Sequence, residues 1–235
     1  MSKFQCVSCG KPADELYRDF NGGIIKISHC SSCDEVVDKY IEYEPVIIYL
    51  DALLLKLPAF RHILINTVQT AIWKFTLVIL LCEAFIRLLQ DRYAKVPSAG
   101  PIKPDYVFYS ALEWNLYYNY AVSAVELMIF LMAVVTVLCI LQRKGGGGLQ
   151  NPQLNIPLVV RSLIWSNFGK VLVIPVMLWG QTYSAIYLSL SRAYVLACYV
   201  QALRVTGPAS SLLEAVSVIS IGSAVQCCVM ACLPT

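Results

Sequence analysis

The stretch Cys6-Val7-Ser8-Cys9-Gly10, with Cys30-Ser31-Ser32-Cys33 further along, decides the fold of the N-terminal part of this chain. Two residues between the cysteines of a pair let a tight turn direct both sulfurs at one ion, and Gly10 is free to adopt a positive φ. Two such pairs, with twenty residues between them, have the spacing of a tetrahedral zinc site. The sequence therefore predicts a zinc ion bound by Cys6, Cys9, Cys30 and Cys33.

The residues between the two pairs favour a zinc ribbon. Residues 15–20 and 24–27 are short β-type runs on either side of Asn21-Gly22-Gly23, which is a hairpin turn signal. Four thiolates fill the coordination shell of zinc and leave no position for a water molecule, so we expect a structural metal and not a catalytic one. The alternatives are redox chemistry by the cysteine pairs, and ligation by His29 beside Cys30.

The composition places most of the chain in a membrane. Hydrophobic residues make up 58% of it and charged residues 14%, which is far from the composition of a soluble protein. The net charge of +3 is small and the basic residues are scattered singly, so a nucleic-acid-binding surface is not expected. The six cysteines outside the two pairs lie in apolar stretches, which indicates a reducing compartment. The polar first residues do not resemble a secretory signal.

Five apolar stretches are each close to the roughly 20 residues that a helix needs to cross the hydrocarbon of a bilayer. They cover residues 68–89, 118–141, 157–179, 183–205 and 211–232. The third stretch is interrupted by Arg161, Lys170 and Pro175, so its first half also fits an interfacial helix. The sequence therefore predicts a mostly α-helical membrane protein, in which an N-terminal zinc ribbon precedes a bundle of four to five transmembrane helices.

We expect three zones: a zinc ribbon over residues 1–40, an amphipathic helical part over 41–66 and a polytopic bundle over 67–235. The apolar run within the middle zone is too short to cross a membrane comfortably. Such a helix lies at the headgroup level, or it packs on the ribbon or on the bundle, and either placement buries the same face. The residues around it that we expect at the membrane surface or at a partner are Asp38, Lys39, Tyr40, Tyr43, Arg61 and His62.

Four ionisable residues inside the apolar stretches are candidates for intramembrane contacts, because a charge in lipid costs roughly 2.5–3.5 kcal/mol on insertion scales. Glu83 and Arg87 are four residues apart on one helical face, so they can neutralise each other. Glu126 and Arg204 have no partner visible in the sequence. We expect these residues to make interhelical contacts, and contact with a lipid headgroup or substrate is the alternative.

Residues 15–66 resemble the homology domain of the Arv family. The resemblance rests on the paired cysteines and on the runs ELYRDF (15–20), IIKI (24–27), VDKYIEYEPVII (37–48) and FRHILIN (60–66). Weaker similarity occurs at 169–175 and 201–205. The resemblance implies an endoplasmic reticulum membrane protein, also present in the Golgi, that mediates sterol homeostasis and the transport of sterols and lipids. It also implies effects on sphingolipid metabolism and on glycosylphosphatidylinositol anchor synthesis.

We expect a non-catalytic protein, because hydrolase and metalloprotease motifs are missing and both histidines lie outside the apolar stretches. One alternative is a scaffold or subunit of a complex that makes lipids or glycosylphosphatidylinositol, whose enzymes would be its partners. A less favoured alternative is a lipid-modifying enzyme that uses Glu83 or Glu126. Because thiolates in a metal site survive best in a reducing compartment, we expect the N-terminus in the cytosol.

Overall fold

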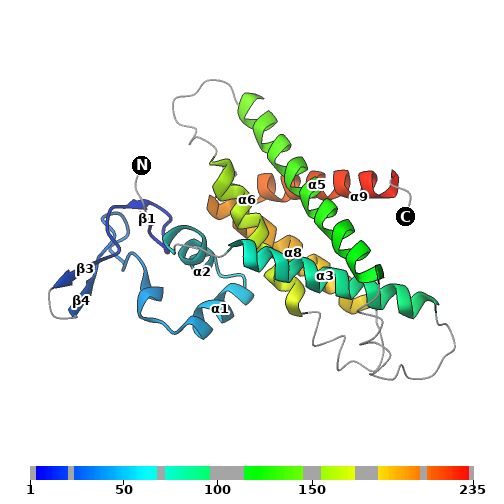
Figure 1. Ribbon diagram of the computed structural model, residues 1–235. Coiled ribbons are helices and arrows are strands. Elements are labelled where there is room, and N and C mark those ends of the chain that lie inside the picture. The colour runs from blue at the N-terminus through cyan, green and yellow to red at the C-terminus, as the bar shows by residue number, and fades with distance from the viewer. Residues whose placement is uncertain are drawn as a thin grey trace.

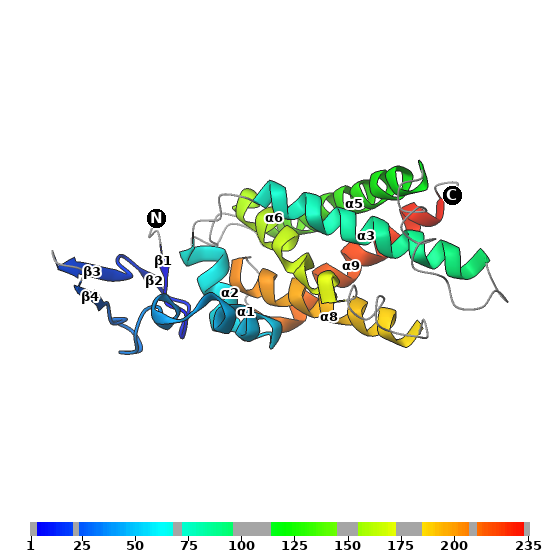
Figure 2. The ribbon, with the colours of Figure 1, turned by 60° about the horizontal axis from the view of Figure 1, so that its bottom comes forward.

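The computed structural model describes residues 4–20, 24–67, 72–95, 114–144, 155–172, 185–206 and 211–232. A small β region lies at one end of the molecule and the long helices lie at the other (Figures 1 and 2). Short helical elements connect the two. This arrangement places the cysteine pairs outside the helical part.

The β region consists of the strands β1 (Phe4–Gln5), β2 (Pro12–Ala13), β3 (Tyr17–Phe20) and β4 (Ile24–Ile27). Each consecutive pair is antiparallel, β1 with β2 and β3 with β4. In the second pair Tyr17 lies opposite Ile27. The predicted hairpin is confirmed in its two strands, and its turn at 21–23 lies outside the described residues.

The connecting part contains η1 (Lys39–Glu42), α1 (Pro45–Leu53), α2 (Leu57–Arg61) and the π-helical turn η2 (His62–Asn66). A proline lies in the first turn of both α1 and α2, where backbone N–H groups have no acceptor within the helix, so the N–H that proline lacks is not missed. α1 ends in a Schellman motif, since Leu55 N–H donates to the Ala52 carbonyl and Lys56 N–H donates to the Asp51 carbonyl. Leu55 adopts the left-handed φ of 58° that this motif requires.

The helical part follows the five predicted apolar stretches. It contains α3 (Ile72–Lys95), α5 (Trp114–Lys144), α6 (Ile156–Trp165), the 3₁₀ segment η3 (Ser166–Leu172), α8 (Ala185–Thr206) and α9 (Leu212–Cys232). The third stretch is not one regular helix, because α6 changes to 3₁₀ geometry at Ser166. Residues 173–179 of that stretch lie outside the described residues.

Two of the described helices are long and apolar enough to cross a membrane, namely the Trp114–Arg143 part of α5 and the whole of α9. α3 and α8 do not meet the same standard of length, hydropathy and low charge. The mostly helical fold and the N-terminal β region with its cysteine cluster are therefore confirmed. Of the four to five predicted crossings, two are supported as candidate membrane helices.

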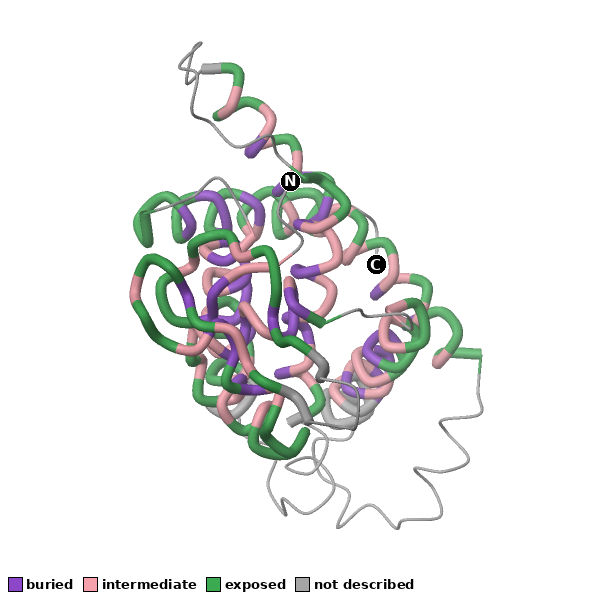
Figure 3. The backbone as a smooth tube through the Cα atoms, turned by 90° about the vertical axis from the view of Figure 1, so that its left-hand side faces the viewer, coloured by how far each residue is buried: buried purple, intermediate pink, exposed green. Residues whose placement is uncertain are grey.

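One apolar core lies between α5, α6, α8 and α9, and Figure 3 shows buried segments gathered in the interior of the molecule. Phe130 and Val134 of α5 belong to this core with Leu203 of α8 and Val218 of α9. α9 approaches α5 so closely at Gly222 that a Cβ there would lie 2.7 Å from a methyl carbon of Val134. Gly222 therefore sets how near these two helices pack.

A second apolar core joins the N-terminal part to the helical part. Phe60 and Leu64, from α2 and η2, are fully buried in it together with Cys198 and Ala202 of α8. The α8 side also satisfies carbonyls at the ends of the short helices. Tyr194 Oη donates to the Leu53 carbonyl at 2.9 Å. The end of α1 is therefore in contact with α8.

The carboxylate of Asp38 fixes the end of the ribbon to η2. Its side chain is fully buried, and its Oδ1 accepts a 3.0 Å hydrogen bond from the Tyr40 backbone N–H. Its Oδ2 lies 2.7 Å from both His62 Nδ1 and Asn66 Nδ2. Asn66 in turn exchanges two hydrogen bonds with the backbone of Gln5 in β1. Since an ionised carboxylate only accepts, His62 Nδ1 is the donor in its pair.

Replacing Asp38 by alanine leaves buried donors of His62 and Asn66 without a partner. We expect Asp38→Ala to lower the free energy of unfolding by about 3 kcal/mol, because breaking a buried charged network strands the remaining groups. Thermal unfolding of the purified protein in detergent measures the loss. Glu35→Ala, an exposed position in the same stretch, serves as the control and should change stability little. Equal stability of the two variants would show that the hydrogen bonds of Asp38 to His62 and Asn66 do not stabilise the fold.

Candidate functional site

The first cysteine pair forms a knuckle held by backbone hydrogen bonds. Cys6 N–H donates to the Lys11 carbonyl and Gly10 N–H donates to the Cys6 carbonyl, both at 2.9 Å. Gly10 has a φ of 79°, in the left-handed region that glycine adopts without strain. The positive φ expected at Gly10 is confirmed.

The second pair repeats the same hydrogen-bonding pattern. Cys30 N–H donates to the Glu35 carbonyl at 2.8 Å, and Asp34 N–H donates to the Cys30 carbonyl at 2.9 Å. Asp34 takes the position that Gly10 has in the first knuckle and is also left-handed, with a φ of 59°. Aspartate tolerates this conformation better than most residues, so the second knuckle forms without a glycine.

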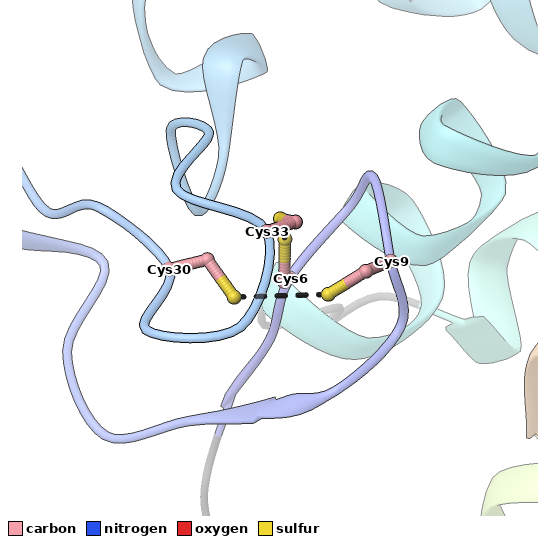
Figure 4. Close-up of side chains that lie close together, drawn as sticks. All are labelled: Cys6, Cys9, Cys30 and Cys33. Carbon is pink, nitrogen blue, oxygen red and sulfur yellow. Dashed lines mark hydrogen bonds between the residues drawn. The ribbon is translucent and has the colours of Figure 1, made fainter.

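The four sulfurs of the two knuckles converge on one point (Figure 4). The sulfurs of Cys6 and Cys33 lie 3.8 Å apart, those of Cys9 and Cys30 lie 3.7 Å apart, and all four lie within 4.8 Å of one another. Four thiolates at about 2.3 Å from zinc have sulfur–sulfur edges of about 3.8 Å in a regular tetrahedron. Two of the sulfur–sulfur distances match this edge and all four sulfurs lie within 4.8 Å, so the cluster has the dimensions of a tetrahedral zinc site.

The thiolate is the form that binds metal, and the surroundings lower the pKa of the Cys30 thiol but raise the pKa of the Cys6 and Cys33 thiols. The backbone N–H groups of Ser32 and Cys33 hydrogen-bond to the Cys30 sulfur and lower the pKa of this thiol to about 6. Burial acts in the opposite direction on Cys6 and raises the pKa of its thiol. A bound cation would lower the pKa of each of these thiols and so favour the thiolate at all of them.

Arg61 contributes a positive charge to the first knuckle from α2. Its Nη1 donates to the carbonyls of Val7 and Ser8, both at 2.7 Å. Four thiolates around a divalent ion have two negative charges in excess, and a guanidinium beside them reduces that excess. Gly10 also leaves room for this side chain, since a Cβ there would lie 2.9 Å from Arg61 Nη2. Thus Arg61 of α2 contributes both a positive charge and two hydrogen bonds to the first knuckle.

A second group of functional side chains lies among the long helices. Arg87 of α3 pairs with Glu126 of α5, and it lies 3.9 Å from Glu83 one turn earlier on α3. Lys170 of η3 pairs with Glu83 at 3.1 Å. These four residues form a charged cluster that joins α3, α5 and η3. Each carboxylate in the cluster is matched by a cation.

The sequence identified three of the four members of this cluster. It gave no partner for Glu126, because a contact between helices that are distant in the chain has no fixed spacing. Lys170 was noted only as an interruption of an apolar stretch. Arg204, which the sequence grouped with the others, lies elsewhere, and its Nη1 donates to Gln201 Oε1 at 3.2 Å.

Comparison with known protein families matches residues 5–203 to the Arv1-like family. Protein ARV1 of Homo sapiens is 38% identical over 204 residues, which cover 87% of this chain and 72% of the human protein. The chain belongs to the Arv1-like family. Protein arv1 homolog of Dictyostelium discoideum is 25% identical over 211 residues, or 85% of this chain and 83% of that protein. No solved structure matches the chain significantly.

The Arv1-like match begins immediately before the first knuckle and ends within α8, so it includes both the cysteine site and the charged cluster. His29 does not join the cysteines in the structure. Its Nδ1 lies 3.1 Å from the Asp34 carbonyl oxygen, and the metal-binding group found among the described residues consists of the four cysteines. The alternative of ligation by His29 is therefore not supported.

The six residues expected at a membrane or partner surface divide into two groups. Asp38, Tyr40, Arg61 and His62 direct their hydrogen bonds to residues of the chain itself, and the first two are buried. Lys39 and Tyr43 are exposed. For Asp38 and Tyr40, an internal role replaces the expected surface role. Only Lys39 and Tyr43 present their side chains outward.

We expect one zinc ion per chain, bound by the four cysteines. Cys30→Ser removes one ligand and should abolish stoichiometric zinc, because an incomplete shell binds the ion far more weakly. Elemental analysis of the purified protein by mass spectrometry measures the metal content. Cys232→Ser, which changes an exposed cysteine at the end of α9, should keep the full zinc content. Stoichiometric zinc in Cys30→Ser would refute the assignment of the ligands.

Proposed function

We propose that this chain is a non-catalytic, multi-pass protein of the endoplasmic reticulum membrane that mediates sterol homeostasis and the intracellular distribution of sterols and lipids. The observation that carries the proposal is membership of the Arv1-like family over residues 5–203. The function is the one that the resemblance to the Arv family implies. A structural zinc ion then folds the ribbon, and the helices supply the membrane part.

The exposed surfaces of α5 and α9 support a place in the membrane. In each helix the most apolar window is mostly exposed, with 28% of it buried in α5 and 22% in α9. A core helix of a soluble protein would instead be largely covered. Met128, Met132 and Leu213 are each at least 60% exposed. Such side chains are unfavourable in water by roughly 25 cal/mol per Å² of apolar surface, and lipid contact removes this cost.

Aromatic side chains occur at two levels of the helical part. Trp73 lies exposed at the start of α3, next to the short helices, whereas Trp114 and Tyr117 lie exposed at the start of α5, near the opposite end. Tryptophan and tyrosine favour the two membrane–water interfaces. We place the bilayer between these levels, with α3 and α8 crossing it beside α5 and α9. The charges of α3 are then offset within the cluster of Glu83 and Arg87.

The first short helix fits the membrane surface on the ribbon side. Tyr43, Val46, Ile47, Leu50 and Leu54 lie three or four residues apart and are all exposed, so they form an apolar stripe along α1. Trp165 of α6 stacks on Tyr49 of α1 with ring centroids 6.4 Å apart, and the preference of tryptophan for the membrane interface supports an interfacial level for α1. We propose that this stripe lies in the headgroup region and that the ribbon faces the cytosol.

A second candidate function is that of a scaffold for enzymes that make sphingolipids or glycosylphosphatidylinositol anchors. The β3–β4 hairpin favours it, because this hairpin projects away from the rest of the molecule (Figure 1). Tyr17 on its first strand is 46% exposed. In this function the hairpin contacts the partner enzyme and the helices hold the complex in the membrane.

Expression in Saccharomyces cerevisiae cells that lack their own ARV1 protein tests the proposed function. We expect the wild-type chain to restore the distribution of free sterol, measured by fluorescence microscopy with a sterol-binding dye. Cys30→Ser should fail, because the ribbon does not fold without its metal. Cys232→Ser should restore the distribution. If the wild-type chain reaches the endoplasmic reticulum and the sterol distribution stays defective, the proposed function is wrong.

A charge in the apolar stripe tests the placement of α1. Leu50→Glu should reduce cross-linking of residues 43–54 to a photoactivatable phospholipid in nanodiscs, because a carboxylate resists transfer out of water. Mass spectrometry of the cross-linked peptides measures the effect. Glu44→Gln, an exposed substitution off the stripe, should leave cross-linking unchanged. Unaltered cross-linking of Leu50→Glu would show that the stripe does not contact lipid.

A further inference from the structure

A cavity of about 440 Å³ opens among α3, α5, η3, α8 and α9. This volume is within the range of sites that bind small molecules, roughly 300–1,000 Å³. The charged cluster of Glu83, Arg87, Glu126 and Lys170 lines it. Apolar side chains such as Ile79, Leu80 and Phe130 complete part of its wall. An occupant therefore needs both a polar and an apolar part.

The charges that line the cavity do not balance. Glu83 and Glu126 are matched by Lys170 and Arg87 through the ion pairs of the cluster. Arg192 of α8 also lines the cavity, and it has no acidic partner among the residues that the structure describes. The lining thus has one positive charge in excess. Arg192 is exposed in the structure, and at the edge of the proposed membrane an unmatched cation attracts an anion more strongly than it would in water.

Two unpartnered polar atoms also point to a missing ligand. Ser123 is 3% exposed and lines the cavity, and its Oγ has no hydrogen-bond partner. The Nε of Arg87 is likewise buried without a partner. Buried donors are almost always satisfied in folded proteins, so these atoms are suited to acceptor oxygens of an occupant. Phosphate oxygens match this requirement and bind guanidinium groups in a fork geometry.

The polarity of the wall changes along the helices. α3 leads away from the ribbon, and along it Ile79 and Leu80 come before Glu83, Arg87 and finally Gln90. α8 returns toward the ribbon, so Arg192 lies farther from the ribbon than Val195 of the same helix. The charged side chains of α3 and α8 therefore lie in the part of the wall away from the ribbon, with Ile86 among them. The apolar part of the wall lies nearer to the ribbon. Such a separation suits an amphiphilic ligand with one charged end.

We infer that this cavity binds the phosphodiester headgroup of a phospholipid with a net charge of −1, and that Arg192 supplies the cation that neutralises it. The inference rests on the proposed membrane function and adds a ligand class to it. A phospholipid of this kind cancels the single excess charge of the wall. A zwitterionic phospholipid adds a further cation beside Arg87, Lys170 and Arg192 and binds less well.

Native mass spectrometry of the full chain in detergent tests this inference with phosphatidylglycerol and phosphatidylcholine of equal acyl length. We expect one phosphatidylglycerol per chain, bound at least about tenfold more tightly than phosphatidylcholine, as a charge-assisted contact allows. Arg192→Gln should lose this preference and Arg192→Lys should retain it. Arg204→Gln removes a cation from the same helix outside the cavity and should bind as the wild-type chain does.

Three results would overturn the inference. The first is equal affinity of the wild-type chain for the two lipids, and the second is an undiminished preference in Arg192→Gln. The third is displacement of phosphatidylglycerol by excess inorganic phosphate, which would show that the site takes a free anion. If the wild-type chain restores sterol distribution in cells but shows no headgroup preference, only this inference fails. If it shows the preference without restoring sterol distribution, only the proposed function fails.

Discussion

The buried carboxylate of Asp38 is the contact on which the relation between the two parts of the molecule depends. It lies at the end of the ribbon and binds His62 and Asn66 of the π-helical turn, while Asn66 reaches back to β1. A buried carboxylate is stable only when its acceptor sites are filled, so the ribbon and η2 can pack in few ways. α2 and η2 then pack on α8 through Phe60 and Leu64. The orientation of the ribbon is thereby transmitted to the long helices.

Both the cysteine site and the charged cluster bring negatively charged groups close together, and both offset these charges with cations. In the ribbon, a divalent cation bound by the four cysteines would, together with Arg61, offset the charges of the thiolates, two of which are buried. Among the long helices, Arg87 and Lys170 offset Glu83 and Glu126, whose side chains are largely buried, so that an isolated charge there would be costly. A zinc ion would fill the coordination shell of the first site and support folding. The second keeps an uncompensated cation beside a cavity, which is the property expected of a binding site.

The sequence predicted the features that depend on local spacing. Two C-x-x-C pairs predict the four cysteines that the structure brings together, because a knuckle needs only a tight turn. Long apolar runs predict the helices, because crossing a bilayer requires length. Long-range contacts have no such spacing. The pairing of Arg87 with Glu126 therefore could not be read from the chain, nor could the burial of Asp38, a residue type that is usually exposed. The break of the third stretch at Ser166 was indicated by its charged residues, although the 3₁₀ geometry was not.

The central claim is that the zinc ribbon and the membrane helices form one unit joined through η2. Hydrogen exchange of the full chain in nanodiscs, with zinc bound and after removal of zinc by a chelator, tests it most directly. We predict that removal of zinc accelerates exchange in residues 4–38 and also in residues 57–66, which contain no zinc ligand, while α5 stays protected. Faster exchange in the ribbon with unchanged exchange in residues 57–66 would contradict the claim, because the two parts would then be independent.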